Sequence, residues 1–136
     1  MSSKIFVNLP VKDLAKSKEF FLKLGYNFDA RFTDDKNACL VISDSIYAML
    51  LNEDFFKNFT KREITDPRKA NECMLAISLD SREAVDQMLE RAIAAGANEY
   101  KKADDHGFMY ERDFEDLDGH IWSMFWMDIS KMQNNA

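Results

Sequence analysis

The sequence predicts an α+β fold made of two βαβββ modules. A strand followed by a helix occurs near the start of the chain and again near its middle. When Phe6 is set against Met74, the helix-capping residue Asp13 falls over Ser81, which indicates an internal repeat. Each copy then ends in further strand-like segments. We expect one domain spanning residues 1–136, with module one at about 4–52, a linker and short helix at 53–71, and module two at about 72–128.

Module one begins with a strand at Ile5–Val11, where every second side chain is apolar. Asp13 fits the N-cap of a helix, because its carboxylate can accept an N–H group of the first turn. Apolar residues follow at helical spacing, and Gly25 suits the position just past the helix end. The remaining strands of the module are expected at Tyr26–Phe32, Ala38–Ile42 and Ile46–Leu51.

The linker between the modules contains an aromatic cluster. Phe55, Phe56 and Phe59 lie among charged residues, a pattern typical of a short amphipathic helix. The rings could form a lid over a pocket, or they could pack against the edge of a sheet. The sequence leaves both interpretations open.

Module two repeats the order of module one. Met74–Leu79 reads as a strand, Asp80 or Ser81 can cap the following helix, and Glu99–Lys102 is a weak strand. A hairpin closes the module at Asp118-Gly119, because glycine takes a positive φ and aspartate hydrogen-bonds the turn backbone. The strand after this turn is apolar on both faces, which predicts burial on both sides, and Ser123 is its small polar exception.

Composition excludes several classes of partner. The net charge is −6, whereas a protein that binds nucleic acid normally carries a basic face. No apolar run approaches the roughly 20 residues of a membrane span, and no signal peptide is recognisable, so we expect a cytoplasmic protein. Cys39 and Cys73 each lie in an apolar run, and we expect two buried, reduced thiols.

Two motifs carry a resemblance to a known family. One is Asp116-Leu117-Asp118-Gly119-His120 followed by a hydrophobic strand, and the other is Leu9-Pro10-Val11-Lys12-Asp13-Leu14 with Leu24-Gly25-Tyr26 at the helix end. Together with the repeat, they make nearly the whole chain similar to the vicinal oxygen chelate superfamily. That superfamily includes glyoxalase I, bleomycin- and fosfomycin-resistance proteins and extradiol dioxygenases. The resemblance implies modules that form a curved, cup-like mixed sheet around a site, and a homodimer.

The resemblance also implies where a divalent metal ion would be held. The corresponding positions are Phe6, Met74, Ser123 and a residue within Tyr47–Leu51, a segment without His, Asp or Glu. Phenylalanine has no donor atom, a thioether prefers soft ions, and a neutral serine hydroxyl binds weakly. We therefore expect no metal and no cofactor, and the metal-dependent mechanisms of the superfamily are not carried over.

The cup positions still describe a candidate site for a small-molecule ligand. Its expected lining is Phe6, Asn8, Met49, Leu51, Met74, Ser123 and Phe125. These side chains either border an open pocket or fill the cup as core, and both remain possible. Weak catalytic candidates are His106 as an acid or base, and Tyr110 or Arg112 as a contact for an anionic substrate.

Three functions follow from these observations. The preferred hypothesis is a metal-free member of the superfamily that binds a small molecule in the cup, or an enzyme of unnamed chemistry. The first alternative is a glyoxalase-type lyase or isomerase with an atypical metal site. The second is an interaction module whose core is filled. The sequence does not identify a ligand.

Overall fold

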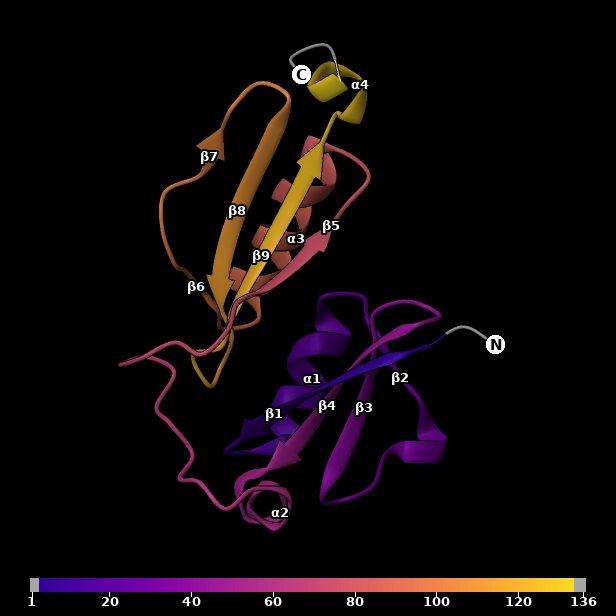
Figure 1. The fold of residues 1–136 in the computed structure, drawn as a ribbon, viewed down its shortest axis with the longest axis vertical. Helices are drawn as coiled ribbons and strands as arrows, with labels where there is room; N and C mark the ends of the chain where they lie inside the picture. The colour runs from indigo at the N-terminus through magenta and orange to yellow at the C-terminus, as the bar shows by residue number, and fades with distance from the viewer. Residues whose placement is uncertain (1–2, 134–136) are drawn as a thin grey trace. The chain divides into compact units, whose positions relative to one another are not determined.

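The computed structural model describes residues 3–133, and the chain divides into two compact units between Asp66 and Pro67. Each unit has its own sheet and its own long helix (Figure 1). This is the predicted α+β fold, with two sheets that each mix parallel and antiparallel strands. None of the helices among these described residues has the length and apolar composition needed to cross a membrane.

Unit one contains the predicted order of strand, helix and three strands. Its elements are β1 (Ile5–Val11), α1 (Leu14–Lys23), β2 (Asn27–Phe28), β3 (Asn37–Val41), β4 (Ile46–Asn52), α2 (Glu53–Phe56) and the 3-10 turns η1 (Ala30–Phe32) and η2 (Lys57–Phe59). The sheet order is β1-β4-β3-β2, and the parallel pairing of β1 with β4 brings the first and last strands together. The short helix predicted in the linker is present as α2.

Helix α1 begins and ends where the sequence predicts. The Asp13 carboxylate accepts the backbone N–H of Lys16 at 3.1 Å, which satisfies one donor of the first turn. Phe20 and Phe21 are buried against the sheet. Gly25, with φ of 100°, then takes the left-handed conformation that ends the helix.

The strand predicted at Tyr26–Phe32 is only partly right, because pairing stops after Phe28. Asp29 accepts the backbone N–H of Arg31 at 3.0 Å and binds its guanidinium at 2.8 Å. These local bonds offer the backbone a turn instead of a ladder, and the chain forms η1. The alternation of apolar residues was therefore outweighed by one side chain.

Unit two repeats the arrangement. Its elements are β5 (Leu75–Ser78), α3 (Arg82–Ala94), β6 (Asn98–Glu99), β7 (Asp104–Asp105), β8 (Met109–Glu115), β9 (Ile121–Met127) and α4 (Ile129–Gln133). Strands run in the order β5-β9-β8-β6, with β5 parallel to β9 and β7 pairing with β8, and α3 packs behind β8 and β9 (Figure 1). The Ser81 hydroxyl caps α3 by accepting the N–H of Ala84 at 3.0 Å. Of the weak strand expected at Glu99–Lys102, only Glu99 is in a strand, β6, and the short strand β7 forms further along the chain.

The β8–β9 turn is held by a buried carboxylate. Asp116 accepts hydrogen bonds from the backbone N–H groups of Asp118 (2.9 Å) and His120 (3.0 Å) and from the Trp122 indole (2.9 Å). Burial raises the pKa of Asp116, and the imidazole of His120 opposes that effect. Gly119 has φ of 92°, and a Cβ there would lie 2.7 Å from Cγ of Arg68. The predicted glycine turn thus depends on a carboxylate two residues upstream of Asp118.

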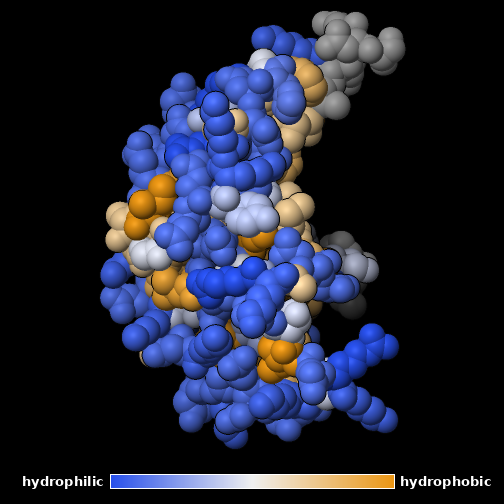
Figure 2. Space-filling view, turned by 90° about the vertical axis from the view of Figure 1, so that its left-hand side faces the viewer, coloured by the Kyte–Doolittle hydropathy of each residue, from blue (hydrophilic) through white to orange (hydrophobic). Residues whose placement is uncertain are grey.

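Each sheet has one face against its long helix and one face away from it. We call the second the open face. In unit one, Val11, Leu40 and Leu50 are buried on the helix side, so the alternate positions of the same strands point to the open face. Most of the visible surface is hydrophilic, with a few separate hydrophobic patches (Figure 2).

The two cysteines differ from the prediction that both are buried. Cys39 on β3 is fully buried, as expected, but Cys73 is exposed. Cys73 lies just before β5, outside the pairing that would have covered it. Burial, followed by the charge of Asp29, raises the pKa of the Cys39 thiol.

Candidate functional site

A pocket of about 220 Å³ lies on the open face of unit one. Its lining consists of Asn8, Asn37, Met49, Leu51, Phe55 and Phe59. The register of the sheet explains this grouping, because Asn8 pairs with Met49 across β1 and β4, and Asn37 pairs with Leu51 across β3 and β4. Three of the seven residues predicted to line the cup, Asn8, Met49 and Leu51, are therefore brought together in one pocket.

One wall of this pocket is aromatic. The chain passes from β4 directly into α2 at Asn52, which places Phe55 and then Phe59 beside the sheet. Their rings meet edge to face, with centroids 5.2 Å apart and an interplanar angle of 84°. Phe59 remains 64% exposed, so its ring can contact both the pocket and solvent. Sequence reasoning found these aromatics, but a role as a lid stays a prediction.

The polar groups of the pocket are two carboxamides. Among the described residues, neither the Asn8 nor the Asn37 side chain takes part in a hydrogen bond, although the Asn37 backbone N–H donates to Asp34 at 3.1 Å. An amide is both a donor and an acceptor, so each can serve a ligand. No charged residue contributes to the described lining.

Phe6 lies on the same open face but outside the pocket lining. Its ring stacks on that of Tyr47 with centroids 4.8 Å apart, and the ammonium of Lys4 lies 5.7 Å from the centroid of Tyr47. Phe6 is 48% exposed, and this stack covers the sheet beside the pocket. Whether it touches a ligand stays a prediction.

The other predicted lining residues belong to unit two. Met74 precedes β5 and is 58% exposed. Ser123 is buried on the open face of β9, directly opposite Asp113 of β8, and Phe125 is half-buried on the same face. Their part in a binding site stays a prediction.

Sequence reasoning missed a carboxyl pair on this face of unit two. Asp113 is 2% exposed, and its Oδ1 atom has no hydrogen-bond partner among the described residues. The ammonium of Lys101 lies 2.8 Å from Asp104, 3.8 Å from Glu111 and 3.8 Å from Asp113. Burial, and then a hydrogen bond with Asp113, raises the pKa of Glu111, so this carboxyl retains a proton more readily than an exposed one. The available signal was that Glu111 and Asp113 lie two residues apart on one strand, and therefore on the same face.

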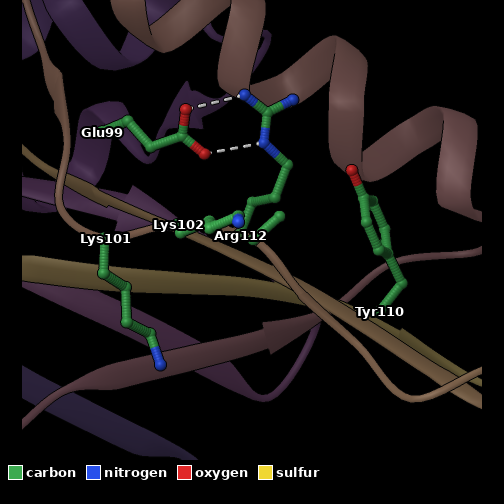
Figure 3. Close-up of a pocket in the computed structure, with 6 residues that line it drawn as sticks. Glu99, Lys101, Lys102, Tyr110 and Arg112 are labelled. Atoms are coloured by element: carbon green, nitrogen blue, oxygen red, sulfur yellow. Dashed lines mark hydrogen bonds and ion pairs between the residues drawn. The ribbon is translucent and has the colours of Figure 1, made fainter.

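Tyr110 and Arg112 point to the opposite face, against α3 (Figure 3). The Tyr110 hydroxyl donates to Asp86 at 2.7 Å, and Arg112 donates to Asp86 at 2.8 Å and to both oxygens of Glu99 at 2.8 and 2.9 Å. The hydrogen bond from Tyr110, assisted by Arg112, lowers the pKa of Asp86, and Arg112 lowers that of Glu99. These bonds brace α3 and β6 against β8.

A second pocket, of about 530 Å³, borders this brace (Figure 3). It is lined by Glu99, Lys101, Lys102, Ala103, Tyr110 and Arg112. Because the guanidinium of Arg112 already binds two carboxylates, its arrangement favours a structural role over the predicted contact with an anionic substrate. His106 is exposed, with its ring 6.5 Å from that of Phe108, and it lines neither pocket. Catalysis by these three residues stays a prediction.

The residues at the metal positions implied by the resemblance do not fit a metal ion. Phe6 is stacked on Tyr47, Met74 is a solvent-exposed thioether, and Ser123 offers a neutral hydroxyl. Within residues 3–133, no group of three or more His, Cys, Asp and Glu side chains is arranged to hold a metal ion. That the protein works without metal stays a prediction.

Comparisons with known proteins agree with this fold. Residues 4–43 match the family model described as bleomycin resistance protein-like N-terminal. A hypothetical protein from S. aureus is 25% identical, with a TM-score of 0.78 over 93% of this chain and 95% of that chain. A glyoxalase/bleomycin resistance protein/dioxygenase family enzyme from Burkholderia phytofirmans PsJN is 16% identical, with a TM-score of 0.76 over 93% of this chain and 99% of that chain. No curated protein matches.

A glyoxalase-related enzyme from Fulvimarina pelagi is also similar, with 20% identity and a TM-score of 0.78 over 93% of this chain and 88% of that chain. Likeness at this level of identity establishes the architecture, while the family model adds a sequence match in the first module. The chain therefore has the glyoxalase/bleomycin-resistance fold, and its resemblance to the vicinal oxygen chelate superfamily is confirmed.

Proposed function

We propose that this protein binds a small molecule in the unit-one pocket, as a member of its fold group that works without a metal ion. The observation that carries the proposal is the pocket lining of four apolar side chains and two carboxamides. Mostly apolar walls with a few polar points are the usual composition of small-molecule sites. A volume of about 220 Å³ supports an open pocket over a filled core, and it suits a ligand of one or two rings.

Metal-independent binding is supported by the residues rather than by any missing ion. Contact with Met49, Leu51, Phe55 and Phe59 removes apolar ligand surface from water, which is favourable without a Lewis acid. A glyoxalase-type lyase would need metal-binding donor groups, which Phe6, Met74 and Ser123 do not supply. Bound metal found by elemental analysis of the purified protein would favour this alternative.

Titration of ¹⁵N-labelled protein with 2-naphthol tests the proposal. We expect backbone amide shifts to concentrate in β1, β3, β4 and the segment of Phe55–Phe59. Phe59→Ala should weaken binding roughly threefold to tenfold, because it removes an aromatic contact. Phe32→Ala is the matched control, since Phe32 is a similarly exposed ring (54%) of unit one outside the lining. Shifts spread evenly over the surface, or equal effects of the two variants, would contradict a site here.

We also infer that the protein pairs with a second copy of itself, as a cytoplasmic homodimer. Strands β1 and β5 are sheet edges, and edges left open promote association. Ile5 and Ile46, which pair in register, are 54% and 41% exposed beside Phe6. Light scattering at micromolar concentration should give twice the mass of one chain, and a monomer mass would count against pairing.

A further inference from the structure

The lining of the unit-one pocket restricts the chemistry of its ligand. Resting on the proposed function, we propose that the pocket takes a neutral, planar aromatic molecule whose head group both donates and accepts hydrogen bonds, such as a carboxamide. Three features of the described residues lead to this class: the apolar floor and wall, the two amides, and the absence of charge in the described lining.

The floor and wall favour a flat ring. Met49 and Leu51 lie two residues apart on β4, so both side chains rise from the same face of the strand. Phe55 and Phe59 stand beside them, already in the edge-to-face geometry that aromatic groups prefer. A further ring can extend this arrangement while its edge meets the Met49 sulfur. An aliphatic chain of equal volume would lack these ring contacts.

The amides favour a head group with mixed hydrogen bonding. Asn8 and Asn37 lie on β1 and β3, on either side of β4, and their partners on β4 are two residues apart, so their backbones stand about 12 Å apart. Each carboxamide offers one acceptor and one donor group, and neither has a partner among the described residues. A carboxylate can only accept, and an amidinium can only donate. An amide head group matches either asparagine in both directions.

Charge distinguishes the unit-one pocket from the pocket described in unit two. The 530 Å³ pocket includes Lys101, Lys102, Arg112 and Glu99, whereas the described lining of the unit-one pocket contains no ionisable side chain. A charged head group entering the latter would lose hydration without gaining an opposite charge. The same ring with a neutral head group avoids this cost.

Three ligands of nearly identical shape test the class. Benzamide is neutral, benzoate is an anion and benzamidine is a cation at pH 7, and each can be titrated into ¹⁵N-labelled protein. We expect benzamide to bind the pocket at least about tenfold more tightly than either ion, which corresponds to ~1.4 kcal/mol. Equal affinity for all three, or a preference for an ion, would overturn the proposed class.

Asparagine variants locate the selectivity. Asn8→Asp and Asn37→Asp each replace a donor by a carboxylate of the same shape, so the preference should move from benzamide to benzamidine. Asn27→Asp is the matched control, because Asn27 is an exposed asparagine of β2 outside the lining. If Asn27→Asp changes the preference as much as the other two, the pocket is not the origin of selectivity and the inference is wrong.

The proposed function and this inference fail differently. If 2-naphthol binds the pocket but benzamide does not, the class is wrong and small-molecule binding stands. If neither ligand shifts the amides of β1, β3 and β4, both proposals are overturned.

Discussion

The two units share their strand pairing and their helix caps, but their open faces differ in chemistry. Both units pair their first and last strands in parallel, and both begin their long helix with a side-chain cap, Asp13 or Ser81. Yet the open face of unit one presents amides and apolar groups, while that of unit two buries Asp113 beside Glu111. The repeat therefore retains the strand pairing and the helix caps, while the residues of the open face change.

The polar groups of the two open faces differ in whether they can ionise. In unit one the polar groups are neutral and accessible, so they can exchange partners with a ligand. In unit two Asp113 is buried and Glu111 is only 20% exposed, and the ammonium of Lys101 lies 3.8 Å from each of them. A buried carboxylate without a full set of partners is costly, and such groups mark functional sites or strained structure.

The largest effect is expected from Trp122, which is fully buried in β9 and donates to Asp116. Trp122→Ala should lower the free energy of unfolding by about 3–5 kcal/mol, since it opens a cavity and leaves the turn carboxylate with one donor fewer. Chemical denaturation followed by far-UV circular dichroism measures this change. A loss below about 1 kcal/mol would mean that unit two is loosely packed.

Adding a ring to each open face should separate the two units. Ser123→Phe places bulk at a buried position opposite Asp113 and should destabilise by about 1–3 kcal/mol. Asn8→Phe places the same ring at an exposed position of the pocket, so folding stability should change by less than about 0.5 kcal/mol while 2-naphthol binding falls. Thermal unfolding of both variants decides whether only one open face is hollow; equal shifts would remove the distinction.

The helix caps should show what the two units share. Asp13→Ala and Ser81→Ala each remove an acceptor from an N-terminal N–H group, and each should cost about 1 kcal/mol. Asp13→Asn and Ser81→Thr retain a capping oxygen and serve as matched controls. Urea unfolding is the measurement. If removing the cap of one unit leaves the free energy of unfolding unchanged, the helix of that unit is held by packing alone.

The smallest effect concerns the pH dependence of unit two. The raised pKa of Glu111 means that the folded protein binds more protons than the unfolded chain just above the ordinary glutamate pKa. Stability from this group is therefore present at low pH and declines as pH rises through the folded-state pKa. Glu111→Gln should remove that decline, so its stability relative to wild type should increase with pH.

Unfolding free energies measured from pH 4 to pH 8 test this sign. The opposite trend would show that Lys101 controls Glu111 more strongly than burial does. Glu19→Gln, at an exposed glutamate of α1, is the matched control. The lowered pKa of Asp86 and Glu99 acts in the other direction, because their contribution is lost as pH falls.

Local patterns predicted most of the fold. Caps, terminal glycines and alternating apolar residues marked α1, α3, β1 and the final hairpin, because these signals act between residues that are close in sequence. The strand at Tyr26–Phe32 was too long, since a single aspartate can redirect a backbone that apolar periodicity alone would extend.

The candidate site was less predictable. Asn8, Met49 and Leu51 were found through strand parity, but Asn37 and the positions of Phe55 and Phe59 depend on pairing and on how the chain leaves β4. Sequence reasoning selected Tyr110 and Arg112, which lie on the helix side of β8. It did not select the carboxyl groups on the other side of the same strand. Which strand face is covered, and by what, is a tertiary property that one sequence states only weakly.

The two cysteines differ in exposure, so a thiol reagent should label them at two different rates. Cys73 is open to solvent, so a thiol reagent should modify it at once in the folded state. Cys39 is fully buried with a raised pKa, and it can react only when the sheet of unit one opens. The slow labelling phase therefore reports the opening frequency of the very face that holds the pocket, and a tightly held ligand should lengthen it without any engineered probe.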